Sequence, residues 1–77
     1  SFLTVYPNPT NDFLSLDKVN EINIDKIEVI DLSGRVVMTS FSNENRTTID
    51  LTSLNSGIYI LKVESDNGTL TQKIVKQ

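Results

Sequence analysis

Apolar and polar residues alternate through most of this chain, which is the pattern of β-strands that bury one face. The clearest run is 58–63, where the odd positions Tyr59, Leu61 and Val63 share one face of an expected strand. Two of the three even positions are isoleucine. Strands that are apolar on both faces are usually covered on both, so we expect this strand to be central and covered on its two sides.

Turn residues divide the rest of the chain into short segments. Pro7–Asp12 is the densest cluster of such residues, Asp31–Arg35 has the composition of a hairpin connection, and Asp66-Asn67-Gly68 is a strong two-residue hairpin signal. The expected strands are Phe2–Tyr6, Phe13–Leu16, Lys26–Asp31, Val36–Phe41, Thr47–Leu51, the run 58–63 and Thr69–Val75. We interpret Asp17–Asp25 as a loop that can include a short extended piece.

Tyr59 follows a turn that contains Gly57. A tyrosine in this position can donate its hydroxyl to the backbone just upstream, which is the tyrosine corner of β-sandwiches. The pattern therefore predicts a Greek-key crossing before the central strand. Together with the strand spacing, it indicates an all-β sandwich of about seven antiparallel strands.

With 77 residues the chain forms one domain, 1–77. It contains no Cys and no His. A disulfide and a Cys/His metal site are therefore excluded, and packing alone must hold the domain together. The usual general base and the strongest nucleophile are missing too, and no spacing singles out a pair among the ten acidic residues. We expect no catalytic residue, no cofactor and no enzyme activity.

The net charge of −3 and pI of about 4.6 argue against nucleic acid as a partner. No apolar run approaches the roughly 20 residues that span a bilayer, so we expect no membrane insertion.

Two weaker ligand hypotheses stay open. Loop oxygens of Asn11, Asp12, Asp17 and Asp25 have the chemistry for calcium, although without EF-hand spacing.

The second ligand hypothesis is an aromatic platform for sugar binding formed by Tyr6, Phe13 and Phe41. Such residues are more often core or cross-strand partners.

Four stretches, taken in order, resemble a known family. They are 5–12 (VYPNPTND), 27–35 (IEVIDLSGR), 49–54 with 57–63 (IDLTSL and GIYILKV), and 73–77 (KIVKQ). The ordered set is similar to the type A C-terminal sorting domain of the type IX (Por) secretion system of Bacteroidetes. The resemblance covers Phe2 to Gln77.

The resemblance implies an Ig-like sandwich of seven strands at the end of a larger exported cargo protein. It implies that the cargo passes through the periplasm and that the outer-membrane translocon and its shuttle protein recognise the folded domain. A sortase-like surface protease then usually removes the domain. The cargo would end at the cell surface or outside the cell.

Carried over residue by residue, the family pattern divides into two groups. The expected structural positions are Pro7, Asn8, Pro9, Gly34, Gly57 and Tyr59. The expected translocon contacts are Arg35, Lys73, Ile74, Val75 and Lys76, the last four in an accessible terminal strand. We expect β-augmentation of that strand, and we expect deletion of Lys73–Gln77 to block export while the domain stays folded.

Two other classes of protein are alternatives to a sorting domain. A fibronectin-like carbohydrate-binding or adhesion module of an extracellular enzyme would need exposed aromatic residues on one sheet face or a calcium site. An adhesive spacer would more naturally occur as tandem copies. An enzyme is a distant third and would require a deep pocket lined with carboxylates.

Overall fold

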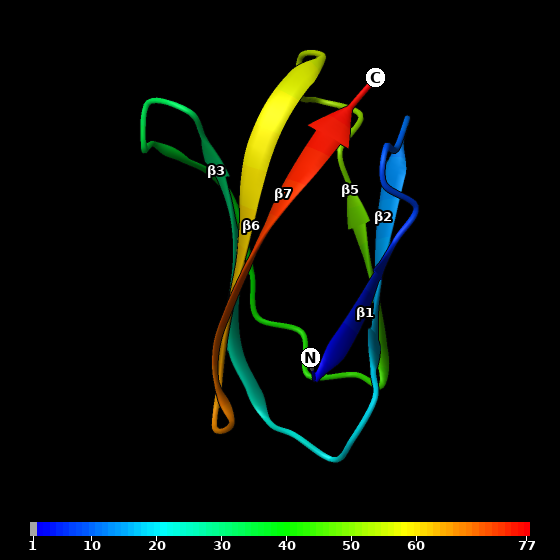
Figure 1. The fold of residues 1–77 in the computed structure, drawn as a ribbon, viewed down its shortest axis with the longest axis vertical. Helices are drawn as coiled ribbons and strands as arrows, with labels where there is room; N and C mark the ends of the chain where they lie inside the picture. Colours follow the sequence, from blue (N-terminus) through cyan, green and yellow to red (C-terminus); the bar gives the residue numbers. More distant parts are fainter. Residues whose placement is uncertain (1) are drawn as a thin grey trace.

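The computed structural model describes residues 2–77, which form seven strands and no helix (Figure 1). The strands are β1 (Leu3–Tyr6), β2 (Phe13–Lys18), β3 (Ile24–Asp31), β4 (Val36–Ser40), β5 (Arg46–Asp50), β6 (Gly57–Ser65) and β7 (Gly68–Lys76). They form a three-stranded sheet, β1-β2-β5, and a four-stranded sheet, β4-β3-β6-β7, each with antiparallel pairing throughout.

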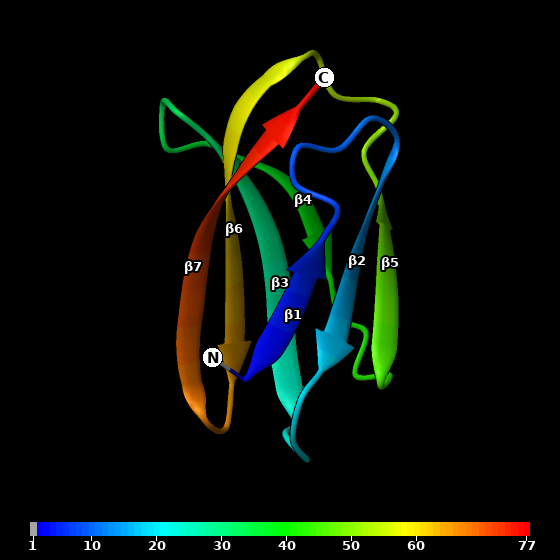
Figure 2. The ribbon, with the colours of Figure 1, turned by 45° about the vertical axis from the view of Figure 1, so that its right-hand side comes forward.

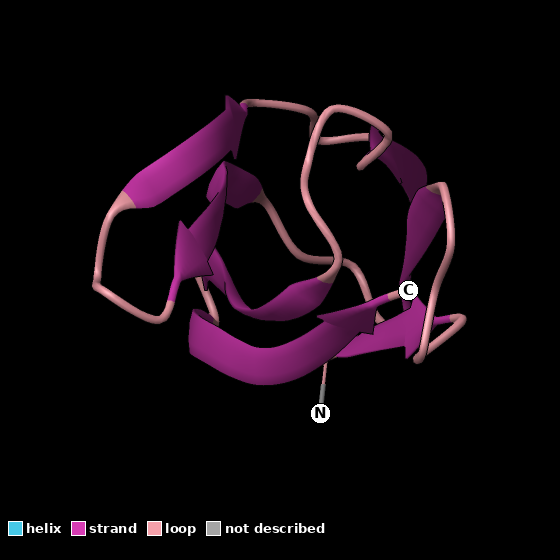
Figure 3. Cartoon of the chain, turned by 90° about the horizontal axis from the view of Figure 1, so that it is seen from above, coloured by secondary structure: helices cyan, strands magenta, loops and turns pink. Residues whose placement is uncertain are grey.

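The connections confirm the predicted sandwich. The chain passes from one sheet to the other after β2, after β4 and after β5, and β6 then returns to lie beside β3. This return after an excursion to the other sheet is a Greek-key crossing. Figure 3 looks along the molecule from one end and shows strands of both sheets around the interior.

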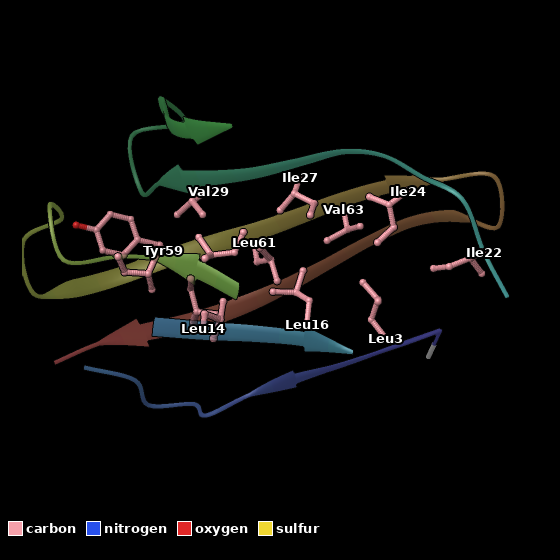
Figure 4. Packing of buried hydrophobic residues seen from close by; sticks show 13 residues of the cluster. Leu3, Leu14, Leu16, Ile22, Ile24, Ile27, Val29, Tyr59, Leu61 and Val63 are labelled. Carbon is pink, nitrogen blue, oxygen red and sulfur yellow. The ribbon is translucent and has the colours of Figure 1, made fainter. Parts of the chain in front are cut away.

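The core lies between the sheets and is built from the alternation along each strand (Figure 4). From β6, Tyr59, Leu61 and Val63 point inward, as the sequence predicts, and Leu14 and Leu16 of β2 face them from the other sheet. The other buried apolar residues are Leu3, Ile22, Ile24, Ile27, Val29, Ile49, Leu51 and Ile74. Each fully buried side chain of this size stabilises the fold by roughly 1.5–3 kcal/mol, so packing accounts for a disulfide-free domain.

β6 is an interior strand, flanked by β3 and β7, but it is covered on one face only. Ile58, on its outer face, is 41% exposed, and Ile60 is half-buried. The prediction of cover on both faces was wrong because residues 2–77 form two layers, and none of their elements packs outside the four-stranded sheet.

The interpretation of Asp17–Asp25 as a loop was also partly wrong. β2 continues to Lys18, β3 begins at Ile24, and both Ile22 and Ile24 are buried. The Lys18 ammonium donates to the Ile22 and Asn43 carbonyls (2.8 and 2.9 Å), which ties this connection to the β4–β5 loop. Ile22 and Ile24 belong to the core, although the polar pairs on either side, Asn20-Glu21 and Asp25-Lys26, interrupt the alternation.

Candidate recognition site

The segment Pro7–Thr10 binds along the end of the C-terminal strand. The Asn8 side-chain amide donates to the Lys73 carbonyl (2.9 Å), and the Val75 amide donates to Asn8 Oδ1 (3.0 Å). The Thr10 amide then donates to the Val75 carbonyl (2.9 Å), and the Gln77 amide donates to the Thr10 carbonyl (2.8 Å). These four bonds occupy the outer edge of β7 from Lys73 to Gln77. We call this arrangement the Asn8 clamp.

The residue types explain the clamp. A side-chain amide carries a donor and an acceptor, as a peptide unit does, so Asn8 can substitute for a neighbouring strand. Pro7 and Pro9 lack an N–H, and the peptide bonds that precede them are both cis. In Figure 2 the loop between β1 and β2 rises beside the end of β7. Thr10 is 2% exposed and forms a parallel bridge with Lys76.

The clamp corrects the expectation of a freely accessible terminal strand. Backbone groups of an antiparallel strand alternate between its two edges, and those of Lys73, Val75 and Gln77 face the clamp. Among the described residues, the edge is therefore open only nearer the start of β7, where none of the other strands pairs with it. Sequence reasoning missed Thr10 and the role of Asn8, because hydrogen bonds between residues 65 to 67 positions apart leave no local signal.

The side chains of the terminal strand differ in accessibility. Ile74 is fully buried in the core, so in the folded domain its side chain cannot contact a partner. Val75 is half-buried on the outer face, and Lys73 is exposed. The Lys76 ammonium lies 3.3 Å from the Gln77 carbonyl. Of the predicted contact residues in this strand, Lys73, Val75 and Lys76 keep an accessible surface.

Arg35 lies at the base of the β3–β4 hairpin, where Asp31 organises the turn. The Asp31 carboxylate accepts hydrogen bonds from the Ser33 amide and hydroxyl and from the Arg35 amide and Nε. The Ser33 hydroxyl first, and then the Arg35 amide, lower the pKa of Asp31 to about 2. Gly34 adopts φ +90°, a conformation that residues with a Cβ rarely take. The Arg35 side chain stays 78% exposed.

The tyrosine corner is present. The Tyr59 hydroxyl donates to the Asn55 carbonyl (2.7 Å), while the ring is 9% exposed and packs in the core. Gly57 is the first residue of β6 and follows the turn directly, with φ +156°. Both predictions for this turn, the hydroxyl contact and the crossing, are confirmed.

These features lie together at one end of the sandwich. Register places Gly57 opposite Lys76, and Tyr59 opposite Asp31 at the start of the hairpin turn. The Asn8 clamp completes the same end. The first described residues lie in the opposite half of the long axis, away from the C-terminus (Figure 1). We call the end that carries the C-terminus the motif end.

The other sequence hypotheses find less support. Asp17 is a strand residue whose carboxylate accepts bonds from Arg46 Nε (2.8 Å) and the Tyr6 hydroxyl (2.9 Å). The Arg46 guanidinium holds the pKa of Asp17 below its usual range. No group of three or more acidic side chains within residues 2–77 is placed to share a metal ion. The described residues therefore provide no cluster of ligands that supports the calcium hypothesis.

The three aromatic residues are exposed but do not form one platform. Tyr6 and Phe13, 37% and 51% exposed, share the outer face of the three-stranded sheet. Phe41 lies in the β4–β5 loop. A surface hollow of about 370 Å³ is lined by Lys18, Glu21, Ile22, Asn23 and Asn45, a set with one carboxylate and therefore no glycosidase-type pair.

Across the described residues, the structure has no helix of the length and apolarity needed to cross a bilayer.

Comparison with known proteins gives the family directly. The family model described as "Secretion system C-terminal sorting domain" matches residues 4–77.

One relative is the ulvan lyase NLR42 of Nonlabens ulvanivorans, 32% identical over 69 residues. The match covers 88% of this chain and 13% of the relative, so the chain spans about an eighth of that protein's length. A sorting signal of this type implies export to the cell surface or the extracellular space. The family match, which covers nearly every residue of the sandwich, shows that this chain belongs to the type IX secretion system C-terminal sorting domains.

Proposed function

We propose that this domain carries a cargo joined to its N-terminal end out of the periplasm by acting as a folded ligand for the type IX translocon and its shuttle protein. The domain itself performs no chemistry. A sortase-like protease at the cell surface then separates cargo and domain.

The observation that supports this proposal is the position of the family motifs. Asn8, the hairpin with Arg35, the tyrosine corner and the terminal lysines gather at the motif end. A cargo that precedes Phe2 would be attached in the opposite half of the molecule. A receptor can therefore approach the motif end without meeting the cargo.

The accessible groups suggest how a receptor would bind. Arg35, Lys73 and Lys76 present cationic groups, and β7 retains an open edge before the Asn8 clamp begins. A strand of the receptor can add to that short edge without disturbing the clamp. Charged groups at the border of such a contact increase the association rate and the specificity more than the affinity.

Export of a reporter tests the proposal. The reporter is fused upstream of residue 2, given a periplasmic signal peptide and expressed in a Bacteroidetes host with and without a working type IX translocon. We expect it at the surface or in the medium only with the translocon, and shortened by about the mass of the domain. Retention of the folded fusion in the periplasm of the competent host would contradict the proposal.

Arg35 offers a sharper test at residue level. Arg35→Gln removes a cationic group at the motif end, and we expect slower export. The matched control is Arg46→Gln, because Arg46 is also exposed (67%) and also pairs with an aspartate, but lies on the three-stranded sheet. Equal export of the two variants would exclude Arg35 as a contact.

One observation favours a second function, carbohydrate binding. Tyr6 and Phe13 are exposed on one sheet face, as that function requires. A glycan screen with the isolated domain tests it. Binding that Phe13→Ala abolishes would support the accessory module, and an absence of binding would exclude it.

A further inference from the structure

The outer face of the four-stranded sheet carries a continuous apolar surface at the motif end. Register places Val36, Ile30 and Ile60 side by side on β4, β3 and β6. Ile58 and Val75 form the next cross-strand pair on the same face of β6 and β7. We call these five residues the apolar end-patch.

Solvent reaches this patch. Val36 is 46% and Ile58 is 41% exposed, and the other three residues are half-buried. Leu32, in the adjacent hairpin turn, is 69% exposed. Single exposed apolar residues are ordinary, but a contiguous set on a sheet with no covering layer is typical of an interaction site.

The charged side chains of this face fall into two groups. Below the apolar end-patch, Lys26 pairs with both glutamates of the face, Glu28 (3.8 Å) and Glu64 (3.4 Å). Lys62, which lies opposite Glu28 in register, and Lys73, which lies opposite Ile60, form no ion pair within residues 2–77. Two unpaired lysines thus border an apolar surface on a domain whose net charge is −3.

We infer that the apolar end-patch, bordered by Lys62 and Lys73, is the docking surface for a protein partner that is apolar at the centre of its contact and carries carboxylates at the rim. The inference rests on the proposed function, since the partner is the receptor that reads the domain. Apolar residues at the centre supply most of the binding energy, while the lysines select an acidic rim. A second copy of the domain carries lysines rather than carboxylates at the border of its own patch, so its charge does not complement this surface.

The first test removes apolar surface without changing strand propensity. The double variant V36T/I58T keeps β-branched side chains at both positions. We expect export of the reporter to slow at least about tenfold, with an unchanged urea midpoint for the isolated domain. The matched control is Val19→Thr, which makes the same substitution at an exposed valine (57%) between β2 and β3 and should leave export unchanged.

The second test reverses the charge. Lys73→Glu places an acid at the border of the apolar end-patch, whereas Lys62 and the patch itself stay intact. We expect export to slow, because two carboxylate surfaces then face each other. Thr48→Glu adds an acid to the outer face of the three-stranded sheet and is expected to export as the unmodified domain does. This pair remains informative even if V36T/I58T does not fold.

The outcomes separate the inference from the proposed function. If the unmodified domain fails to export the reporter, the proposed function is wrong. If it exports the reporter and V36T/I58T and Lys73→Glu match it, the docking surface is wrong while the sorting function stands. Sedimentation that shows a dimer lost in V36T/I58T, with export unchanged, would assign the patch to self-association and overturn the inference.

Discussion

Single side chains determine two local structures at the motif end, and Asp31 is the clearer case. Its carboxylate binds four hydrogen-bond donors of the hairpin, and its pKa is about 2 in the folded domain. The ordinary value is about 3.9, so the unfolded chain binds this proton more readily. The stability that Asp31 contributes is therefore complete above about pH 4 and is lost as the pH falls toward about 2.

We predict that the free energy of unfolding of the unmodified domain falls more steeply between about pH 4 and pH 2 than that of Asp31→Asn. Urea unfolding at a series of pH values measures this. Asp12→Asn is the control, since the Asp12 side chain accepts no hydrogen bond from residues 2–77. A decline in Asp31→Asn as steep as in the unmodified domain would contradict the assignment.

Asn8 acts through both atoms of its amide. Asn8→Ala removes the bonds to Lys73 and Val75, and at ~0.5–1.5 kcal/mol each we expect a loss of ~1–3 kcal/mol in the free energy of unfolding. The Val75 amide should also lose hydrogen-exchange protection. Asn11→Ala, in the same loop, should change neither quantity. If Asn8→Ala is as stable as Asn11→Ala, the clamp contributes nothing in solution.

At the scale of elements, β7 belongs to the core as much as to the recognition site. Ile74 is fully buried, and the ends of the clamp bind the backbone of Val75 and Gln77. Contrary to the expectation from sequence, we now predict that deletion of Lys73–Gln77 unfolds the domain. Ile74→Ala alone should cost ~2–5 kcal/mol. Circular dichroism and urea unfolding of both variants would show this.

A deletion that leaves a cooperative unfolding transition would restore the original expectation. If the deletion of Lys73–Gln77 unfolds the domain, an export assay of that variant cannot distinguish the loss of receptor contacts from the loss of the folded structure. Point variants at Lys73 and Lys76, which leave Ile74 in place, avoid this ambiguity.

At the scale of the molecule, the two ends of the sandwich carry different features. The described chain begins in one half of a body about 32 Å long, and the C-terminus, the hairpin and the clamp lie at the end of the other half. We predict that a folded reporter fused after Gln77 blocks export, because it stands beside the motif end, whereas the same reporter before residue 2 is exported. A cell-surface accessibility assay compares the two, and equal export of both fusions would contradict a receptor at the motif end.

Local pattern and turn chemistry in the sequence were sufficient to determine the class of fold. Alternation in 58–63 predicted the inward side chains of β6, and the Gly57–Tyr59 spacing predicted both the hydroxyl contact and the Greek-key crossing. The same approach failed for Ile22 and Ile24, because a short run of mixed residues has no clear period. The ordered motifs also indicated the family, which the family match confirms.

Tertiary structure decided everything that depends on which distant residues meet. The Asn8 clamp joins residues 65 or more positions apart, so the accessibility of the terminal strand cannot be read along the chain. The exposed face of β6 depends on the number of layers, and the apolar end-patch depends on the register of four strands. Alternation indicates which residues share a face of a strand, whereas only the assembled sheets determine whether another layer, a neighbouring loop or solvent covers that face.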